Sequence, residues 1–174
     1  MPDNVVLIGF SGTGKSSIGR VLAERLGWPL VDTDDLIVRR FEKCIAAIFR
    51  EDGEAVFRAA ERDAVATACA GRHQVISLGG GAPVALENRA KIRDKNWVVR
   101  LEASPEVILH RLRTSPGAEE RPMLAGADPL GRIRSLLAAR ADAYGIADFA
   151  VDTAERSIDE VAATIIKRYL GRGV

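Results

Sequence analysis

The sequence has little of what would direct a chain to a nucleic acid, a disulfide framework or a membrane. Its net charge is only +1, from 25 basic and 24 acidic side chains, so it lacks the strongly basic balance of a nucleic-acid binder. Its two cysteines, Cys44 and Cys69, have neither metal-ligand spacing nor the density of a disulfide scaffold. The apolar run near the N-terminus, Val5–Ile8, is too short for a signal peptide or a membrane span. We therefore expect a cytoplasmic protein with no nucleic-acid or membrane partner.

Length and hydrophobic pattern predict one α/β domain. The 174 residues fit a single domain, and 47% of them are hydrophobic, which is enough for a sizeable core. Short apolar runs alternate with longer segments of helical spacing, as in domains wound around a parallel sheet. The expected strands are Val5–Ile8, Leu30–Val31, Val75–Leu78, Trp97–Leu101 and Phe149–Val151. We predict a five-stranded parallel sheet with helices on both faces.

Two regions interrupt this alternation. About forty residues between the second and third strands read as helices with a turn at Asp52–Gly53, which is more than one crossover requires. We expect part of this insertion, about residues 33–61, to form a substrate-binding wall. Prolines and glycines around residues 114–129 are too dense for a regular element, and they predict a mobile lid over about residues 114–126.

The strongest motif is Gly9–Ser16, a complete G-x-x-x-x-G-K-S between an apolar strand and an amphipathic helix. The glycines let backbone N–H groups converge on a phosphate, and the helix dipole adds positive potential. Lys15 is expected to span the β- and γ-phosphates, and the Ser16 hydroxyl to ligate Mg²⁺. The motif therefore predicts a nucleoside triphosphate bound with magnesium. The expected contacts are Gly12, Thr13, Gly14, Lys15, Ser16 and Ser17. The sequence has no guanine-reading Asn-Lys-x-Asp, which argues against a GTPase.

Two carboxylates, Asp32 and Asp34, follow the second strand. Residues two apart in an extended chain point the same way, so both would face one site. At the carboxyl end of a parallel strand, one can hold a magnesium-bound water and the other can accept a proton from a substrate hydroxyl. The alternative is that Thr33 or Asp34 caps a helix beginning at Leu36.

Two weaker signals concern a second substrate, which would bind beside the triphosphate. The run Gly79–Gly81 after the third strand would let a ligand contact backbone N–H groups, although a flexible turn explains it almost equally well. Arg58 is followed three residues later by Glu61, so the carboxylate can hold the guanidinium on one helix face. Such an arginine suits an acidic substrate, and the alternative is a surface ion pair.

Together these residues resemble shikimate kinases, from the phosphate loop to the C-terminal helix. The resemblance is carried by Gly9–Ser16, Asp32–Asp34, Ile48-Phe49, Gly53-Glu54, Phe57-Arg58 with Glu61, Leu78–Gly81, Arg121–Leu124, and Arg140 ahead of Tyr144. It implies a fold like that of nucleoside monophosphate kinases, with sheet order 2-3-1-4-5, an insertion that binds shikimate and a lid that closes over ATP. It also implies a monomer that transfers the γ-phosphoryl group of ATP to the 3-hydroxyl of shikimate with Mg²⁺.

The resemblance also implies roles for individual residues. Asp34 matches the residue at the reacting hydroxyl, and Arg58 and Arg140 match those that grip the shikimate carboxylate. Gly80 and Gly81 match backbone contacts to the substrate, and Asp32 matches the aspartate that supports magnesium through water. Arg121 matches the lid arginine that reaches the transferred phosphate, and Arg111 lies near the adenine-stacking arginine, with Arg113 close enough to compete. The catalytic residues are then Lys15, Asp34 and Arg121.

Three alternatives remain open: a kinase for gluconate, a kinase for an aminated shikimate, and an ATP-binding module that has lost transfer. The chain departs from the family pattern in three places. It lacks a proline soon after Arg140, and it has Ile158 near the adenine pocket, where many members have a proline. The segment Lys43–Ala47 is also unusual, since a small or polar residue often precedes the helix there in the family.

Overall fold

The computed structural model describes residues 2–116 and 124–173. A single five-stranded sheet runs through them, with all strands parallel in the order β2-β3-β1-β4-β5. The strands are β1 (Asn4–Ile8), β2 (Leu30–Asp32), β3 (Val75–Ser77), β4 (Asn96–Glu102) and β5 (Phe149–Asp152). The predicted strands and their predicted order are confirmed, and each predicted strand end lies within about one residue of the observed one.

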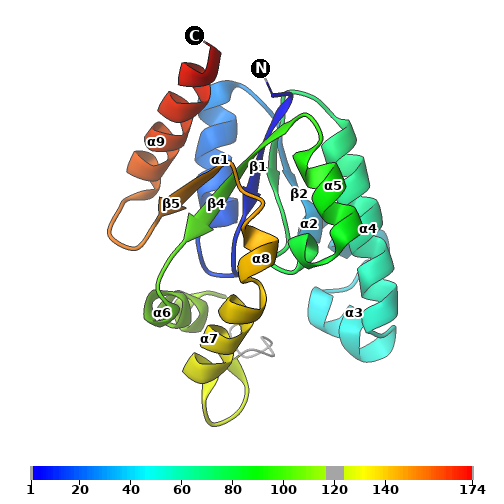
Figure 1. The fold of residues 1–174 in the computed structure, drawn as a ribbon. Coiled ribbons are helices and arrows are strands. Elements are labelled where there is room, and N and C mark those ends of the chain that lie inside the picture. Colours follow the sequence, from blue (N-terminus) through cyan, green and yellow to red (C-terminus); the bar gives the residue numbers. More distant parts are fainter. Residues whose placement is uncertain (1, 117–123, 174) are drawn as a thin grey trace.

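Helices cover both faces of this sheet (Figure 1). They are α1 (Lys15–Leu26), α2 (Thr33–Phe41), α3 (Ile45–Glu51), α4 (Glu54–Ala70), α5 (Leu86–Arg93), α6 (Pro105–Thr114), α7 (Pro129–Ala139), α8 (Ala141–Tyr144) and α9 (Ile158–Leu170), with short 3₁₀ turns η1 (Ala82–Val84) and η4 (Gly171–Gly173). In Figure 1, α1 and α9 lie on one face of the sheet, and α4 and α5 lie on the other. The α3 and α7 helices lie at the end of the molecule opposite both termini. Among residues 2–116 and 124–173, no helix is both long enough and apolar enough to cross a membrane.

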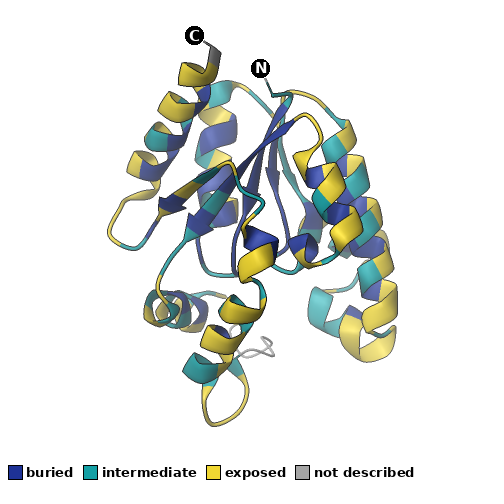
Figure 2. Ribbon diagram, in the orientation of Figure 1, coloured by how far each residue is buried: buried dark blue, intermediate teal, exposed yellow. Residues whose placement is uncertain are grey.

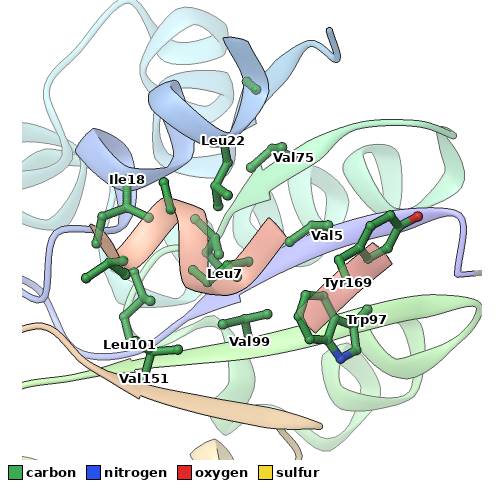
Figure 3. Close-up of a cluster of buried hydrophobic side chains, with 14 residues drawn as sticks. Val5, Leu7, Ile18, Leu22, Val75, Trp97, Val99, Leu101, Val151 and Tyr169 are labelled. Carbon is green, nitrogen blue, oxygen red and sulfur yellow. The ribbon is translucent and has the colours of Figure 1, made fainter. Parts of the chain in front are cut away.

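The central strand β1 is buried along its whole length, which explains why its sequence is continuously apolar rather than alternating. Val5 and Leu7 pack with residues of α1 and α9 (Figure 3). Val6 and Ile8, between them in sequence, pack on the other face with residues of α4 and α5. Figure 2 shows the central strands as buried, the edge strand β5 as partly exposed and the outer surfaces of the helices as largely exposed. Packing on both faces thus fixes the sheet, and because all its strands are parallel, their carboxyl ends lie at one edge.

The insertion between β2 and β3 is helical, as predicted, and has a small core of its own. Ile37 of α2, Ile48 of α3 and Phe57 of α4 are buried together. Gly53 joins α3 to α4 with a φ of 91°, which confirms the predicted turn. At the predicted lid, α6 ends at Thr114 and α7 begins at Pro129. Residues 117–123 lie outside the described residues, so the lid remains a prediction.

Candidate active site

The phosphate loop joins β1 to α1 at the carboxyl edge of the sheet. Lys15, the first residue of α1, donates from Nζ to the carbonyl oxygens of Gly9 and Phe10, both at 2.9 Å. The buried Thr13 donates from Oγ1 to the same Phe10 carbonyl at 2.8 Å, which keeps the loop curled. Gly14 is the N-cap of α1 and offers no side-chain cap, so the first N–H groups of the helix are left for an anion.

A cavity of about 390 Å³, here called the phosphate pocket, lies over this loop. The predicted site residues that line it are Gly12, Gly14, Lys15, Ser16, Ser17, Asp32, Asp34, Gly80 and Arg111. Thr13 lines a smaller cavity of about 90 Å³, which shares Gly14, Ser17 and Arg111 with the phosphate pocket. A larger cavity of about 550 Å³ beside β5 and α9 is lined by none of the predicted site residues. The structure therefore brings residues from separate motifs into one pocket.

Asp32 ends β2 and connects two of the elements around this pocket. Its Oδ1 accepts a hydrogen bond from the N–H of Asp34 at 3.0 Å, and its Oδ2 accepts one from Ser16 Oγ at 3.0 Å. The first bond makes Asp32 the N-cap of α2. The alternative in which Thr33 or Asp34 caps a helix beginning at Leu36 is therefore wrong, because α2 begins at Thr33. The extended backbone assumed for Asp34 is wrong for the same reason, although both carboxylates do line one pocket.

Asp34 lies in the first turn of α2, where its surroundings disfavour a charge. Burial and the nearby Asp32 carboxylate raise the pKa of Asp34 from 3.8 to about 6, although Lys15 opposes the shift. The backbone of Gly79 packs against this carboxylate so closely that a Cβ there would stand 2.5 Å from Asp34 Oδ1. A carboxylate with such a pKa is suited to accept a proton near neutral pH.

Thr33 has a role that the sequence analysis missed. It is fully buried, and its Oγ1 accepts a hydrogen bond from the Gly79 N–H at 3.0 Å. The same oxygen lies 3.5 Å from the Ser77 carbonyl oxygen at the end of β3. Thr33 thus fastens the start of α2 to the glycine turn. The sequence shows a hydroxyl residue, Thr33, between two aspartates, which is a signal for a polar role. It gives no sign of the partner of Thr33, because Gly79 lies 46 residues away in the sequence.

Arg58 and Glu61 form the pair that their spacing predicted. Arg58 Nη1 donates to Glu61 Oε2 at 2.9 Å, and Arg58 Nε and Nη2 lie 3.3 Å from Glu54 Oε1. The Glu61 side chain is 4% exposed and the Arg58 side chain 36%, so this is not a solvated surface pair. Burial raises the pKa of Glu61, and the Arg58 guanidinium opposes the rise. Glu61 therefore holds the guanidinium in place.

The Arg58 guanidinium lies between aromatic rings and the glycine turn. Its central carbon is 5.3 Å from the ring centre of Phe57 and 5.9 Å from that of Phe49. A Cβ on Gly81 would stand 2.9 Å from Arg58 Nη1, so the two residues are in close contact. The structure thus brings together two predicted substrate-binding residues from α4 and the turn after β3.

Arg140 and Tyr144 approach the neighbouring residue of the turn. Arg140 is the N-cap of α8, and its Nη1 donates to the Gly80 carbonyl oxygen at 3.2 Å. Tyr144 Oη donates to the same oxygen at 2.7 Å. The Arg140 guanidinium carbon is 5.3 Å from the ring centre of Phe10 in the phosphate loop. Both side chains thus contact the turn, although no proline follows Arg140.

Of Arg111 and Arg113, both near the end of α6, it is Arg111 that contacts the phosphate loop. It donates from Nη1 to Thr153 Oγ1 at 2.9 Å and from Nη2 to the Thr153 carbonyl at 2.6 Å. Its Nη1 also lies 3.4 Å from the Gly12 carbonyl oxygen. Arg113 is exposed. Thr153, a residue that the sequence analysis missed, is buried and also donates to the Thr13 carbonyl. Arg121 lies outside the described residues.

Sheet order and a phosphate loop after the central strand together define a P-loop kinase fold. The family model of shikimate kinase matches residues 11–170. A shikimate kinase from Symbiobacterium thermophilum is 45% identical over 171 residues, which cover 98% of both chains. One from Geobacter sulfurreducens is 43% identical over 162 residues, which cover 93% of this chain and 88% of that one.

Solved structures agree with the sequence relatives. The shikimate kinase from Acinetobacter baumannii, in complex with shikimate, has a TM-score of 0.91 to this chain at 30% identity. The match covers 99% of this chain and 95% of that one. The chain belongs to the shikimate kinase family. The prediction of an ATP-dependent kinase with this fold is thereby confirmed.

Proposed function

We propose that this chain transfers the γ-phosphoryl group of ATP to the 3-hydroxyl of shikimate in the phosphate pocket, giving shikimate 3-phosphate and ADP. One observation carries the proposal: two arginines converge on a turn at this pocket. Arg58 contacts Gly81, and Arg140 donates to the Gly80 carbonyl. The planar guanidinium matches a carboxylate by two parallel hydrogen bonds. The shikimate bound to the Acinetobacter baumannii relative carries such a carboxylate, which supports this acceptor.

The triphosphate of ATP is assigned to the phosphate loop. Lys15 Nζ donates to the Gly9 and Phe10 carbonyl oxygens of the loop, which places the ammonium where it can bind the negatively charged oxygens of a phosphate. Gly12, Thr13, Gly14, Ser16 and Ser17 supply the surrounding loop and the start of α1. The adenine end is assigned to Arg111, because Thr153 fixes its guanidinium beside the loop.

Magnesium is assigned to Ser16 and Asp32. The Ser16 hydroxyl and the Asp32 carboxylate are oxygen donors 3.0 Å apart, the ligand type that Mg²⁺ prefers. In residues 2–116 and 124–173 no group of three or more His, Cys, Asp or Glu residues could hold a metal, so phosphates and water must complete the coordination. When bound, the ion neutralises charge on the phosphates. Ser16 orients the site from α1, and Asp32 supports it from β2.

Asp34 is assigned as the base that accepts the proton of the 3-hydroxyl. Above its pKa of about 6 the group is ionised, so at neutral pH it can take this proton. Arg58, Arg140, Gly80 and Gly81 orient the acceptor beside it. Phosphoryl transfer asks for little covalent chemistry, so the main contribution of these residues is positioning. Arg121, outside the described residues, is assigned to neutralise charge on the transferred group when the lid over about residues 114–126 closes.

Acceptor choice separates this function from the open alternatives. A coupled assay of ADP release is run with shikimate, aminoshikimate, gluconate and no acceptor. We expect rapid ADP release with shikimate, none with gluconate and little without an acceptor. Gluconate has a carboxylate on an open chain, so it lacks the ring that fixes the 3-hydroxyl of shikimate relative to its carboxylate. Faster turnover with aminoshikimate than with shikimate would move the assignment to the aminated substrate, and ADP release without any transfer would contradict the proposal.

We place the enzyme in the cytoplasm as a single-domain monomer, with no nucleic-acid or membrane partner. Light scattering across a concentration series tests the monomer, and a mass that rises with concentration would contradict it.

A further inference from the structure

The carbonyl oxygen of Gly80 accepts two hydrogen bonds from side chains of one short segment. Tyr144 Oη donates at 2.7 Å and Arg140 Nη1 donates at 3.2 Å. Gly80 lines the phosphate pocket, so the shared oxygen belongs to a residue of the proposed substrate site. Tyr144 is 4% exposed, and its ring packs in the core that includes Ile8 and Leu78. The carbonyl therefore has one donor fixed in the core and one that reaches from the N-cap of α8.

The two donors differ in charge and in what else they can bind. The Tyr144 hydroxyl is neutral, and burial raises its pKa, so it remains a donor at physiological pH. The Arg140 guanidinium is charged and has five N–H donors in a planar fork. A carboxylate binds such a fork more strongly than a neutral carbonyl does. When an acidic acceptor enters, Arg140 gains by exchanging the Gly80 carbonyl for the carboxylate.

We propose that Tyr144 is a positioning residue, whose hydroxyl keeps the Gly80 carbonyl hydrogen-bonded while Arg140 leaves it for the carboxylate of the acceptor. The inference rests on the proposed function, which assigns Arg140 to the carboxylate. Gly80 is half-buried, so its carbonyl has limited access to water and would carry part of the desolvation penalty of a buried group if it lost every donor. Tyr144 removes this penalty, so the exchange is favourable. Without the hydroxyl, the carbonyl would hold Arg140 back, and the acceptor would bind more weakly.

The first test removes the hydroxyl and keeps the ring. In Tyr144→Phe we expect the KM for shikimate to rise about three- to tenfold, the range of a single neutral hydrogen bond. The kcat and the KM for ATP should stay within about twofold, because the hydroxyl donates to Gly80 and not to a residue assigned to the nucleotide. An unchanged KM for shikimate, or an equal rise for both substrates, would overturn the proposal.

The chain contains a matched control in its second tyrosine. Tyr169 is also 4% exposed, and its Oη also donates to a backbone carbonyl, that of Pro2 at 2.9 Å. Tyr169→Phe therefore loses the same type of bond in a different core, the one shown in Figure 3. We expect both variants to lower the Tm slightly and only Tyr144→Phe to change the KM for shikimate. The same KM change in Tyr169→Phe would mean that lost stability, not Gly80, is the cause, and would overturn the proposal.

A double-mutant cycle with Arg140→Met tests whether Tyr144 acts through Arg140. Arg140→Met alone should raise the KM for shikimate strongly, and adding Tyr144→Phe should then raise it no further. If the two effects multiply, Tyr144 acts independently of Arg140 and this inference alone fails. If Arg140→Met leaves the KM for shikimate unchanged, the assignment of Arg140 in the proposed function fails, and the inference falls with it.

Discussion

The Asp34 carboxylate rests on the backbone of Gly79, at a distance where a Cβ on residue 79 would stand 2.5 Å from Oδ1. Thr33 maintains this contact, because its Oγ1 accepts the Gly79 N–H while its backbone continues directly into Asp34. The proposed base is thus supported by a residue without a side chain. The contact contributes to the burial that raises the pKa of Asp34, and it takes no space from an acceptor.

Replacing this glycine should therefore disable catalysis. In Gly79→Ala the new methyl group must displace the Asp34 carboxylate, and a shift of about 1 Å at a reacting group can lower the rate about 100-fold. We expect a loss of this order in kcat, measured by ADP release with both substrates saturating. Gly171→Ala is the control, since a Cβ there would meet nothing within 4 Å. A Gly79→Ala enzyme with wild-type kcat would show that the carboxylate need not occupy this position.

Removing the charge of Asp34 should abolish transfer and leave ATP binding intact. Asparagine keeps the shape of the side chain but cannot accept a proton, so Asp34→Asn should lower kcat by roughly 10²–10⁴-fold. ATP affinity, measured by titration calorimetry, should be unchanged. The neighbouring Asp35→Asn, also in the first turn of α2 but exposed, is the matched control. An Asp34→Asn enzyme that keeps more than about a tenth of the wild-type kcat would remove the general base from the mechanism.

The raised pKa of Asp34 predicts opposite effects of pH on activity and stability. Below pH about 6 the carboxyl is protonated and cannot act as a base, so kcat/KM for shikimate should fall on the acidic side of that value. The folded-state pKa of about 6 lies above the ordinary 3.8, so folding disfavours the charged form, and stability falls as pH rises from about 4 to above 6.

Asp34→Asn removes the free-energy cost of holding a charged carboxylate in the folded protein. Its Tm should exceed that of the wild type at pH 8, and the gap should shrink as pH is lowered toward 4. Thermal unfolding at several pH values measures the gap. An equal difference in Tm between variant and wild type at pH 4 and pH 8 would show that the charge of Asp34 does not affect the stability of the fold.

Arg58 should affect the acceptor and not the nucleotide. In Arg58→Ala the loss of charge-assisted hydrogen bonds worth about 1.5–3 kcal/mol should raise the KM for shikimate about ten- to a hundredfold, with the KM for ATP unchanged. Arg40→Ala is the control, because Arg40 pairs with Asp63 at the surface, where both side chains are more than half exposed. Equal increases in both KM values for Arg58→Ala would indicate a structural role, since Glu61 would be left buried without its partner.

Local patterns predicted the framework of the molecule closely. The strands were found because each is a short apolar run, and in the central strands β1, β3 and β4 burial on both faces of the sheet requires such a run. The Gly9–Ser16 motif located the phosphate site for a similar reason, since the curled loop and the helix that follows it are consecutive in the chain. The Arg58–Glu61 pair could also be predicted, because its two residues lie three apart on the same turn of α4.

Contacts between distant segments could not be predicted in this way. The extended geometry assumed at Asp34 was wrong, because capping by Asp32 starts α2 directly at the strand end. Neither the support of Asp34 by Gly79 nor the shared Gly80 carbonyl has a local signal, since their partners come from other elements. The sequence by itself determined the strands, the phosphate loop and the kinds of side chain available to the site. Only the tertiary structure decided which of them meet, because packing of the helices on the sheet sets the distances between residues far apart in the chain.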